Sequence, residues 1–205
     1  MIVLSHRGHW LKADEKNEWV AFERTVADAF GTETDVRDHD GRLVISHDPA
    51  PATARDWADL VDLFDGRGLP LAVNVKADGL SGLLDAAFAG RDIDWFAFDM
   101  SGPETVRYAR AGLPYFTRHS DVEAEPVLYA EAQGVWLDAF HDHGWMTTDV
   151  IRRHLDADKR VCLVSPDLHG RSHEAFWETL ADLAPQTDDL MLCTDLPLKA
   201  REMFG

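Results

Sequence analysis

Positive charge, cysteine and long apolar runs are all scarce in this sequence, and each shortage excludes a class of protein. Lys and Arg number 20 against 37 Asp and Glu, which gives a net charge of −17. A surface this acidic repels nucleic acid and anionic membranes, so we expect neither as a partner. No apolar stretch is long enough to span a bilayer, so we also expect no membrane insertion.

Cysteine is limited to Cys162 and Cys193, and both lie in apolar runs. Such a pair favours buried, reduced thiols over a disulfide. The first residues, MIVLSHRG, are interpreted as a strand with polar residues at its end and not as a signal peptide. Together these features predict a cytoplasmic location.

The remaining composition is that of an ordinary folded protein. Hydrophobic residues make up 45% of the chain and charged residues 28%, which argues against disorder. No low-complexity segment or linker interrupts the pattern, so we expect one domain over residues 1–205. The pattern leaves the oligomeric state open.

Short apolar segments alternate with helical patterns along the chain. Eight segments are predicted as strands, at residues 2–6, 32–37, 71–76, 95–100, 114–120, 134–139, 160–166 and 190–195. Eight patterns are predicted as helices, at residues 17–30, 54–64, 81–90, 103–112, 125–134, 147–158, 172–183 and 197–204. This alternation is typical of α/β proteins with a parallel sheet. Eight units predict a compact (β/α)₈ TIM barrel, a fold that has roughly 250 residues on average.

One stretch, TETDVRDHDGRLVISHD at residues 32–48, departs from the simple repeat. The Asp40-Gly41 pair is typical of a tight hairpin turn, and apolar residues flank it on both sides. We therefore expect a small hairpin inserted after the second strand. It would bring His47 close to the end of that strand.

Nearly every predicted strand ends in a charged or reactive residue, whereas the strand beginnings are not comparably polar. Functional groups of such a barrel come from the carboxyl ends of its strands and the loops that follow. The side chains expected there are His6, Arg7, Glu33, Asp35, His47, Asn74, Lys76, Asp99, Arg118, Asp138, Ser165 and Asp195. We expect Arg118 and His119 to face this mouth. His169, in the loop after the seventh strand, is a candidate for substrate contact there, and the alternative is that this loop is merely solvated.

Glu33 and Asp35 are two residues apart, so they point to the same side of a strand. Paired carboxylates at this spacing suit a hard divalent cation such as Mg²⁺ or Ca²⁺. The alternative is a polar strand end that Arg7 or Arg37 neutralises. His6 and His47 come from different segments and could act as general acid and general base beside a metal.

These residues occur in an order that closely resembles the signature of the glycerophosphodiester phosphodiesterase family. That family has His-Arg-Gly, an Asn before an Ala-Phe helix, Glu-x-Asp-Val, Asp-Gly and His-Asp. The matching positions are His6, Arg7, Gly8, Asn17, Ala21, Phe22, Glu33, Asp35, Val36, Asp40, Gly41, His47 and Asp48. Two later segments, LAVNVK and LMLCTDLP, are similar to the family's Glu-x-Lys and Thr-Asp-x-Pro segments.

The resemblance implies a (β/α)₈ barrel, a divalent metal and a role for each matching residue. His6 and His47 would be the acid–base pair, Arg7 and Lys76 would contact phosphate, and Glu33 and Asp35 would be metal ligands. The family's third ligand is a Glu, where this chain has Asn74. The Asn74 carbonyl oxygen could still bind a cation, with one negative charge fewer, or Asp99 or Asp138 could supply a carboxylate.

The expected activity is therefore metal-dependent cleavage of a small glycerophosphodiester-like substrate. Arg118 and His169 are the further candidates for substrate contact. Glycerol, a lipid head group and a glycerophosphate-decorated polysaccharide all fit as the alcohol part. Two alternatives remain. The first is a non-catalytic phosphate-binding module, motivated by Asn74, and the second is an aldolase that forms a Schiff base on Lys76.

Overall fold

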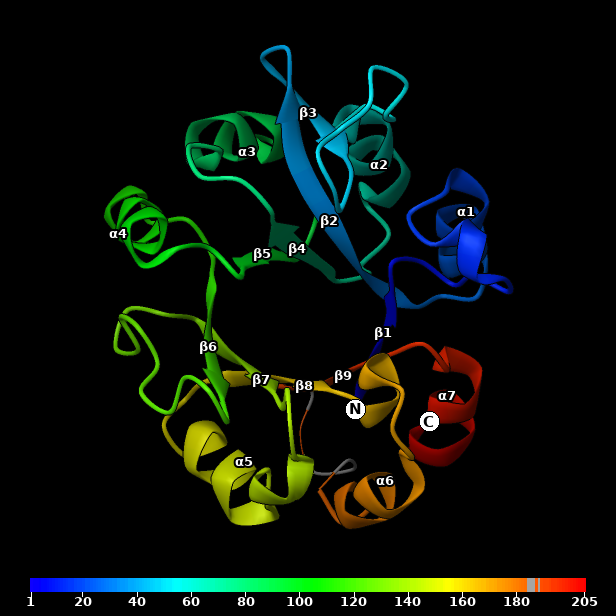
Figure 1. Ribbon diagram of the computed structural model, residues 1–205, viewed down its shortest axis with the longest axis vertical. Coiled ribbons are helices and arrows are strands. Elements are labelled where there is room, and N and C mark those ends of the chain that lie inside the picture. Colours follow the sequence, from blue (N-terminus) through cyan, green and yellow to red (C-terminus); the bar gives the residue numbers. More distant parts are fainter. Residues whose placement is uncertain (184–186, 188) are drawn as a thin grey trace.

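The computed structural model shows a (β/α)₈ barrel, as predicted, and describes residues 1–183, 187 and 189–205. Eight parallel strands lie in the order β5-β4-β2-β1-β9-β8-β7-β6 around a central axis, with the helices outside them (Figure 1). The barrel is nearly closed, because β5 and β6 are joined only by a bridge between Ala97 and Tyr115 and a 3.0 Å hydrogen bond from Ala97 N to Pro114 O. The parallel strands are β1 (Ile2–His6), β2 (Gly31–His39), β4 (Leu71–Val75), β5 (Trp95–Phe98), β6 (Phe116–Ser120), β7 (Gly134–Asp138), β8 (Arg160–Val164) and β9 (Leu190–Thr194).

The predicted hairpin after the second strand is confirmed. β2 continues beyond the barrel and pairs antiparallel with β3 (Arg42–Ile45). Asp40 and Gly41 connect them with φ values of 50° and 78°, the left-handed conformation that a two-residue turn of this kind requires. The hairpin rises from the barrel wall and brings the chain back toward the mouth at His47.

In the described part of the chain, short helices follow seven of the strand units. They are α1 (Trp19–Ala27), α2 (Trp57–Phe64), α3 (Ser81–Phe88), α4 (Gly102–Ala111), α5 (Thr148–Leu155), α6 (Glu174–Leu180) and α7 (Pro197–Phe204), with 3₁₀ helices at Ala13–Glu15, His143–Trp145 and Pro166–His169. Their buried sides pack on the strands and form two of the three apolar clusters. None of the described helices is long and apolar enough to cross a membrane.

The helix predicted at residues 125–134 is wrong, because this segment consists of turns. Polar side chains from neighbouring segments donate hydrogen bonds to its backbone carbonyl groups, which in a helix would accept backbone N–H groups of the same segment. Thr117 Oγ1 donates to Val127 O at 2.7 Å, and Tyr115 Oη donates to Leu128 O at 2.9 Å. Lys159 Nζ donates to a further carbonyl, that of Ala132, at 2.7 Å. Tertiary contacts therefore override the local helical pattern.

The barrel interior is packed with apolar side chains below a polar layer. Phe96 stacks on Phe116 with 3.6 Å between ring centroids, and Phe98 stacks on Trp136 at 3.8 Å. Cys162 and Cys193 lie in the same cluster as free, buried thiols, as expected. Side chains two residues apart on a strand share a face. Inward residues such as Leu4, Ala72 and Trp136 are therefore followed, toward the carboxyl end of the strand, by His6, Asn74 and Asp138.

Candidate active site

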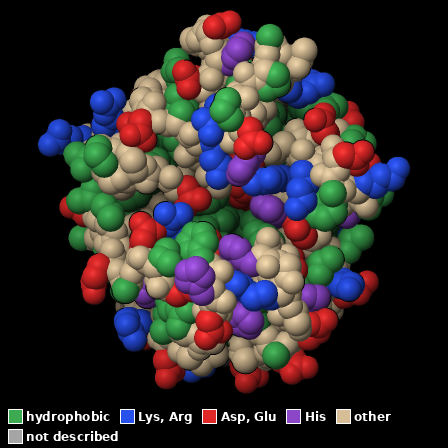
Figure 2. Space-filling model, viewed as in Figure 1, with side chains coloured by type: hydrophobic (Ala, Val, Ile, Leu, Met, Phe, Trp, Pro, Cys, Tyr) green, Lys and Arg blue, Asp and Glu red, His purple; other side chains and the backbone are tan. Residues whose placement is uncertain are grey.

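The polar strand ends gather around one cavity of about 280 Å³ at the carboxyl ends of the strands. Figure 2 shows Lys, Arg and His side chains next to acidic and hydrophobic ones in the middle of the viewed face. The cavity is lined by His6, Arg7, Glu33, His47, Asn74, Lys76, Phe98, Asp99, Trp136, Asp138, Phe140, Val164, Leu168 and His169. Most of the residues that the sequence indicated therefore lie around the same space.

A tight turn after β1 positions the first two of these side chains. Arg7 and Gly8 have φ values of 59° and 84°, so the chain reverses sharply toward α1. A Cβ atom at position 8 would lie 2.8 Å from Ala21 Cβ, which is closer than real Cβ atoms pack. The glycine therefore permits the close approach between this turn and α1, while His6 and Arg7 remain at the mouth.

His6 is held by a carboxylate from the other end of the chain. Its Nδ1 lies 2.6 Å from Asp195 Oδ1, just after β9, which is the neighbour of β1. Lys16 Nζ donates to Asp195 Oδ2 at 3.1 Å. Burial raises the pKa of Asp195, but the hydrogen bonds and charges of His6 and Lys16 outweigh this and the net pKa is lowered. Asp195 stays ionised and fixes the imidazole, leaving Nε2 of His6 available for chemistry.

Asp35 is fully buried and lies between two cations. Arg7 Nε is 3.0 Å from its Oδ2, and Lys76 Nζ is 3.3 Å from its Oδ1. Asn17 Nδ2 also donates to Oδ2, at 2.8 Å. The neutralisation by Arg7 that the sequence suggested as an alternative is therefore present, and Lys76 shares it. The same arrangement holds both cationic side chains at the edge of the cavity.

Glu33 lies beside this group and is nearly inaccessible to solvent. Burial, followed by the charge of Asp35, raises its pKa to about 7 from 4.5. Its Oε2 accepts the Arg7 backbone N–H at 3.2 Å and lies 3.9 Å from His6 Nε2. A buried carboxylate with a raised pKa marks a place where the protein alone supplies too little positive charge.

Asn74 and Asp99 form the next part of the wall. Asn74 pairs with Asp35 across β2 and β4, and its Oδ1 is buried without a hydrogen-bond partner. Asp99 has a φ of 64° and accepts a 3.0 Å hydrogen bond from Arg118 Nη1. Burial raises the pKa of Asp99, while Arg118, Lys76 and a hydrogen bond from Asn74 act against the increase. Arg118 therefore contacts the site through Asp99 and does not line the cavity itself.

The oxygen atoms of Glu33, Asp35 and Asn74 fit a hard divalent cation in kind. Asn74 Oδ1 is buried without a hydrogen-bond partner, and the buried Asp35 Oδ1 makes no hydrogen bond although it lies 3.3 Å from Lys76 Nζ. Oxygens of this type suit Mg²⁺ or Ca²⁺. No cluster of three or more His, Cys, Asp and Glu side chains suited to a metal is found among the described residues. A cation at this place would therefore depend on the Asn74 amide.

The other two imidazoles of the cavity differ in their surroundings. His47 lies at the rim, with its side chain 46% exposed and its Nδ1 2.9 Å from Asp48 Oδ1. His169 comes from the 3₁₀ helix Pro166–His169, and its Nε2 lies 2.7 Å from the buried Asp138. Asp138 is therefore the partner of His169. His119 was expected at the mouth, but it points away from it and its Nδ1 lies 3.0 Å from His154 Nε2 on α5.

Sequence reasoning missed how the carboxylates pair with the imidazoles. Asp195 and Asp138 were recognised as strand-end residues, but their assignment to His6 and His169 depends on which strands are neighbours in the barrel. Lys16 was missed altogether, because a lysine in a short loop carries no distinctive pattern. The Thr-Asp-x-Pro segment around Asp195 was the available signal for the first pair.

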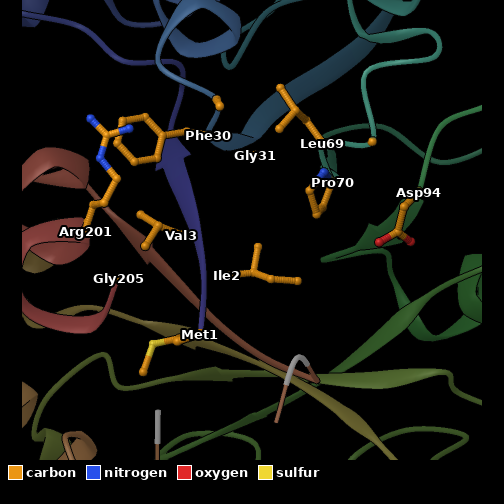
Figure 3. Close-up of a pocket in the computed structure, with 12 residues that line it drawn as sticks. Met1, Ile2, Val3, Phe30, Gly31, Leu69, Pro70, Asp94, Arg201 and Gly205 are labelled. Carbon is orange, nitrogen blue, oxygen red and sulfur yellow. The ribbon is translucent and has the colours of Figure 1, made fainter. Parts of the chain in front are cut away.

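A second cavity, of about 400 Å³, lies at the opposite end of the barrel. Figure 3 shows Ile2, Val3, Leu69 and Pro70 there, with the Arg201 side chain beside the ring of Phe30. Both oxygens of Asp94 in this cavity are bound by Arg160, at 2.8 and 2.6 Å. Since its charged groups are paired in this way, the cavity lacks the convergent chemistry of the mouth.

The chain is similar in fold to a solved enzyme structure, the crystal structure of a glycerophosphodiester phosphodiesterase from Parabacteroides distasonis ATCC 8503. The TM-score is 0.64 at 14% sequence identity, and the match covers 99% of this chain and 96% of that one. No protein-family model and no curated protein matches the sequence. At this level of identity the likeness establishes the barrel, so the chemistry depends on the residues described above.

Proposed function

We propose that the protein is a metal-dependent phosphodiesterase that cleaves a small glycerophosphodiester-like substrate. The observation that carries this proposal is one cavity lined by the cations Arg7 and Lys76, the buried carboxylate of Glu33 and the carboxylate-bound His6, with the buried Asp35 paired to both cations. In a chain with a net charge of −17, Arg7 and Lys76 are held at the bottom of the mouth, where an anionic phosphate needs them.

Glu33, Asp35 and Asn74 would hold Mg²⁺ or Ca²⁺, with Asp99 as the nearest further carboxylate. A bound cation polarises phosphate oxygens and offsets charge that develops on them. The raised pKa of Glu33 and the buried Asn74 Oδ1 without a hydrogen-bond partner support this assignment, because positive charge at this position would stabilise both groups. Arg7 and Lys76 stabilise the phosphoryl group directly, as fixed donors in a partly dry cavity.

His6 is the better supported member of the acid–base pair. Asp195 binds Nδ1 of His6, so Nε2 can accept a proton from an attacking water or from a neighbouring hydroxyl of the substrate. The predicted partner, His47, lies across the mouth at the rim of the same cavity. One imidazole removes a proton from the nucleophile, and the second gives one to the departing alcohol.

The test is hydrolysis of a panel of phosphodiesters by the purified protein with Mg²⁺ or Ca²⁺. We expect release of the alcohol, and a loss of about 10²- to 10⁴-fold in kcat for His6→Gln. The His47→Ala variant tests the second histidine, since a rate equal to that of the wild type would remove His47 from the acid–base pair. Absence of turnover for every diester and metal would reject the proposed activity.

A second candidate function is binding of a phosphate ligand without turnover, and Asn74 is the observation that favours it. An amide in place of a carboxylate leaves the cation site with less charge. Calorimetry would then show tight binding of a phosphodiester that stays intact. The aldolase alternative is disfavoured, because a Schiff base needs a neutral amine and Lys76 Nζ is paired with the buried carboxylate of Asp35 at 3.3 Å.

A further inference from the structure

A third imidazole in the cavity is held in the same manner as His6. His169 Nε2 lies 2.7 Å from Asp138 Oδ1. Asp138 is buried at the end of β7, and its Oδ1 also accepts the Ala139 backbone N–H at 2.7 Å. A carboxylate fixed in this way orients the imidazole.

The segment that carries His169 is tied to the residue that orients His6. Asp167 Oδ2 accepts hydrogen bonds from Thr194 Oγ1 at 2.9 Å and from the Asp195 backbone N–H at 2.8 Å. After His169 the chain turns at Gly170, and Arg171 Nη1 donates to the carbonyl of Phe140 at 3.0 Å. The two imidazole–carboxylate pairs therefore belong to one rigid frame.

His47 lacks this support. Its side chain is 46% exposed and that of its partner Asp48 is 87% exposed, against 26% for His169 and 11% for Asp138. An exposed pair is screened by water and holds its geometry weakly. A group that must deliver a proton to a particular oxygen atom benefits from fixed geometry.

The neighbours of His169 also provide room for the alcohol part of a substrate. The Phe140 ring lies 5.8 Å from the His169 ring between centroids, and Trp136 and Leu168 line the cavity next to them. Apolar carbons can pack on these side chains. The group around Asp35 comes from other parts of the barrel, because Asp35 lies on β2 and its partners Arg7 and Lys76 directly follow β1 and β4.

We propose that His169, oriented by Asp138, protonates the leaving alcohol, a role that rests on the proposed phosphodiesterase activity. As the bond between phosphorus and the alcohol oxygen breaks, its electron pair stays on that oxygen. The oxygen takes the proton from Nδ1 of the His169 imidazolium, which becomes neutral. The oxygen of the attacking water forms the new bond to phosphorus, its proton passes to His6 Nε2, and exchange with solvent resets both groups. In this mechanism His169 replaces His47 as the proton donor to the leaving group, and His47 remains a rim residue of the cavity.

Two diesters of glycerophosphate test this role, one with ethanol and one with 4-nitrophenol as the leaving group. Ethoxide needs a proton to leave, whereas nitrophenolate leaves without one. We expect His169→Gln to lose about 10²- to 10⁴-fold in kcat on the ethyl diester and to retain nearly the wild-type rate on the nitrophenyl diester. His47→Gln is the matched control, and its loss should be the same on both substrates.

Equal loss on the two substrates in His169→Gln, or no loss on either, would overturn the assignment. So would a leaving-group dependence that appears in His47→Gln instead. Asp138→Asn keeps the shape of the dyad and should show the same selective loss, so it serves if His169→Gln fails to fold. Failure of the wild type to hydrolyse either diester refutes the phosphodiesterase proposal itself, an outcome distinct from a flat pattern in an active enzyme.

Discussion

The two ends of the barrel differ in how far their polar groups are satisfied. The cavity at the amino ends of the strands has a volume of about 400 Å³, and two cavities at the mouth that share Arg7 and His47 have volumes of about 280 and 420 Å³. Its Asp94 is fully bound by Arg160, and Arg201 donates to Asp28 O at 2.6 Å while its guanidinium lies 4.4 Å from the Phe30 ring centroid. The mouth instead contains a carboxylate with a raised pKa and a buried amide oxygen, that of Asn74, without a hydrogen-bond partner.

Cavity volume therefore does not separate the two ends of the barrel, whereas the pairing of their polar groups does. Polar groups that are paired within the fold contribute to stability and have little free hydrogen-bonding capacity or uncompensated charge with which to bind a ligand. Groups that remain strained, unpaired or shifted in pKa mark a site that something else completes. Changes at the mouth should therefore affect activity, and equivalent changes at the opposite end should affect stability alone.

The largest expected effect comes from exchanging one side chain at each end. His6→Gln removes the imidazole that Asp195 orients and should reduce kcat about 10³-fold, with little change in the melting temperature. Arg201→Ala at the opposite cavity should retain wild-type kcat and KM. Steady-state kinetics on a phosphodiester checks both, and an equal loss in the two variants would break the distinction between the ends.

Glycine substitutions compare the ends next. Gly8 has a φ of 84° and an added Cβ would lie 2.8 Å from Ala21 Cβ, whereas Gly68, at the opposite cavity, has a φ of 65° and open space around it. Both alanine variants strain the backbone, by about 1 kcal/mol. Gly8→Ala adds a clash, so its free energy of unfolding should fall by about 3 kcal/mol. Denaturant titration measures the difference, and only Gly8→Ala should also lose activity.

Glu33 allows a test in which stability and function move in opposite directions. Its folded pKa of about 7 lies above the ordinary 4.5, so the unfolded chain ionises first and stability is lost as the pH rises through this interval. Glu33→Gln removes this loss of stability, because a glutamine side chain does not ionise. Without metal, its free energy of unfolding at about pH 8 should exceed that of the wild type by about 3 kcal/mol.

The difference in unfolding free energy between Glu33→Gln and the wild type should vanish below about pH 4, where Glu33 is protonated in both the folded and the unfolded chain. Calorimetry should show weaker Mg²⁺ binding by the variant. A variant that is less stable than the wild type at high pH would mean that the ionised Glu33 carboxylate stabilises the fold, as a member of an ordinary structural ion pair does.

The smallest effect is expected from Arg201→Ala on stability. The substitution removes a cation–π contact with Phe30 and an exposed hydrogen bond, which together contribute about 1 kcal/mol. Thermal unfolding should show a small decrease in melting temperature at unchanged activity. A change in KM would indicate that the opposite cavity communicates with the mouth.

The strand ends could be predicted from the sequence because parallel strands bring their carboxyl ends to the same rim. His6, Glu33, Asn74 and Lys76 were placed at this rim from local patterns, and the structure brings them to one cavity. The pairing of side chains could not be predicted in this way. His6 and Asp195 are 189 residues apart and meet only because β1 and β9 are neighbours.

By itself, the sequence determined the order of strands and helices, the Asp-Gly hairpin and the polar character of the mouth, since these follow from local periodicity and turn chemistry. The tertiary structure decided which carboxylate orients which imidazole, why His119 points outward and why residues 125–134 form no helix. Each of these outcomes depends on groups that are distant in the chain, and closure of the barrel brings them within hydrogen-bonding distance.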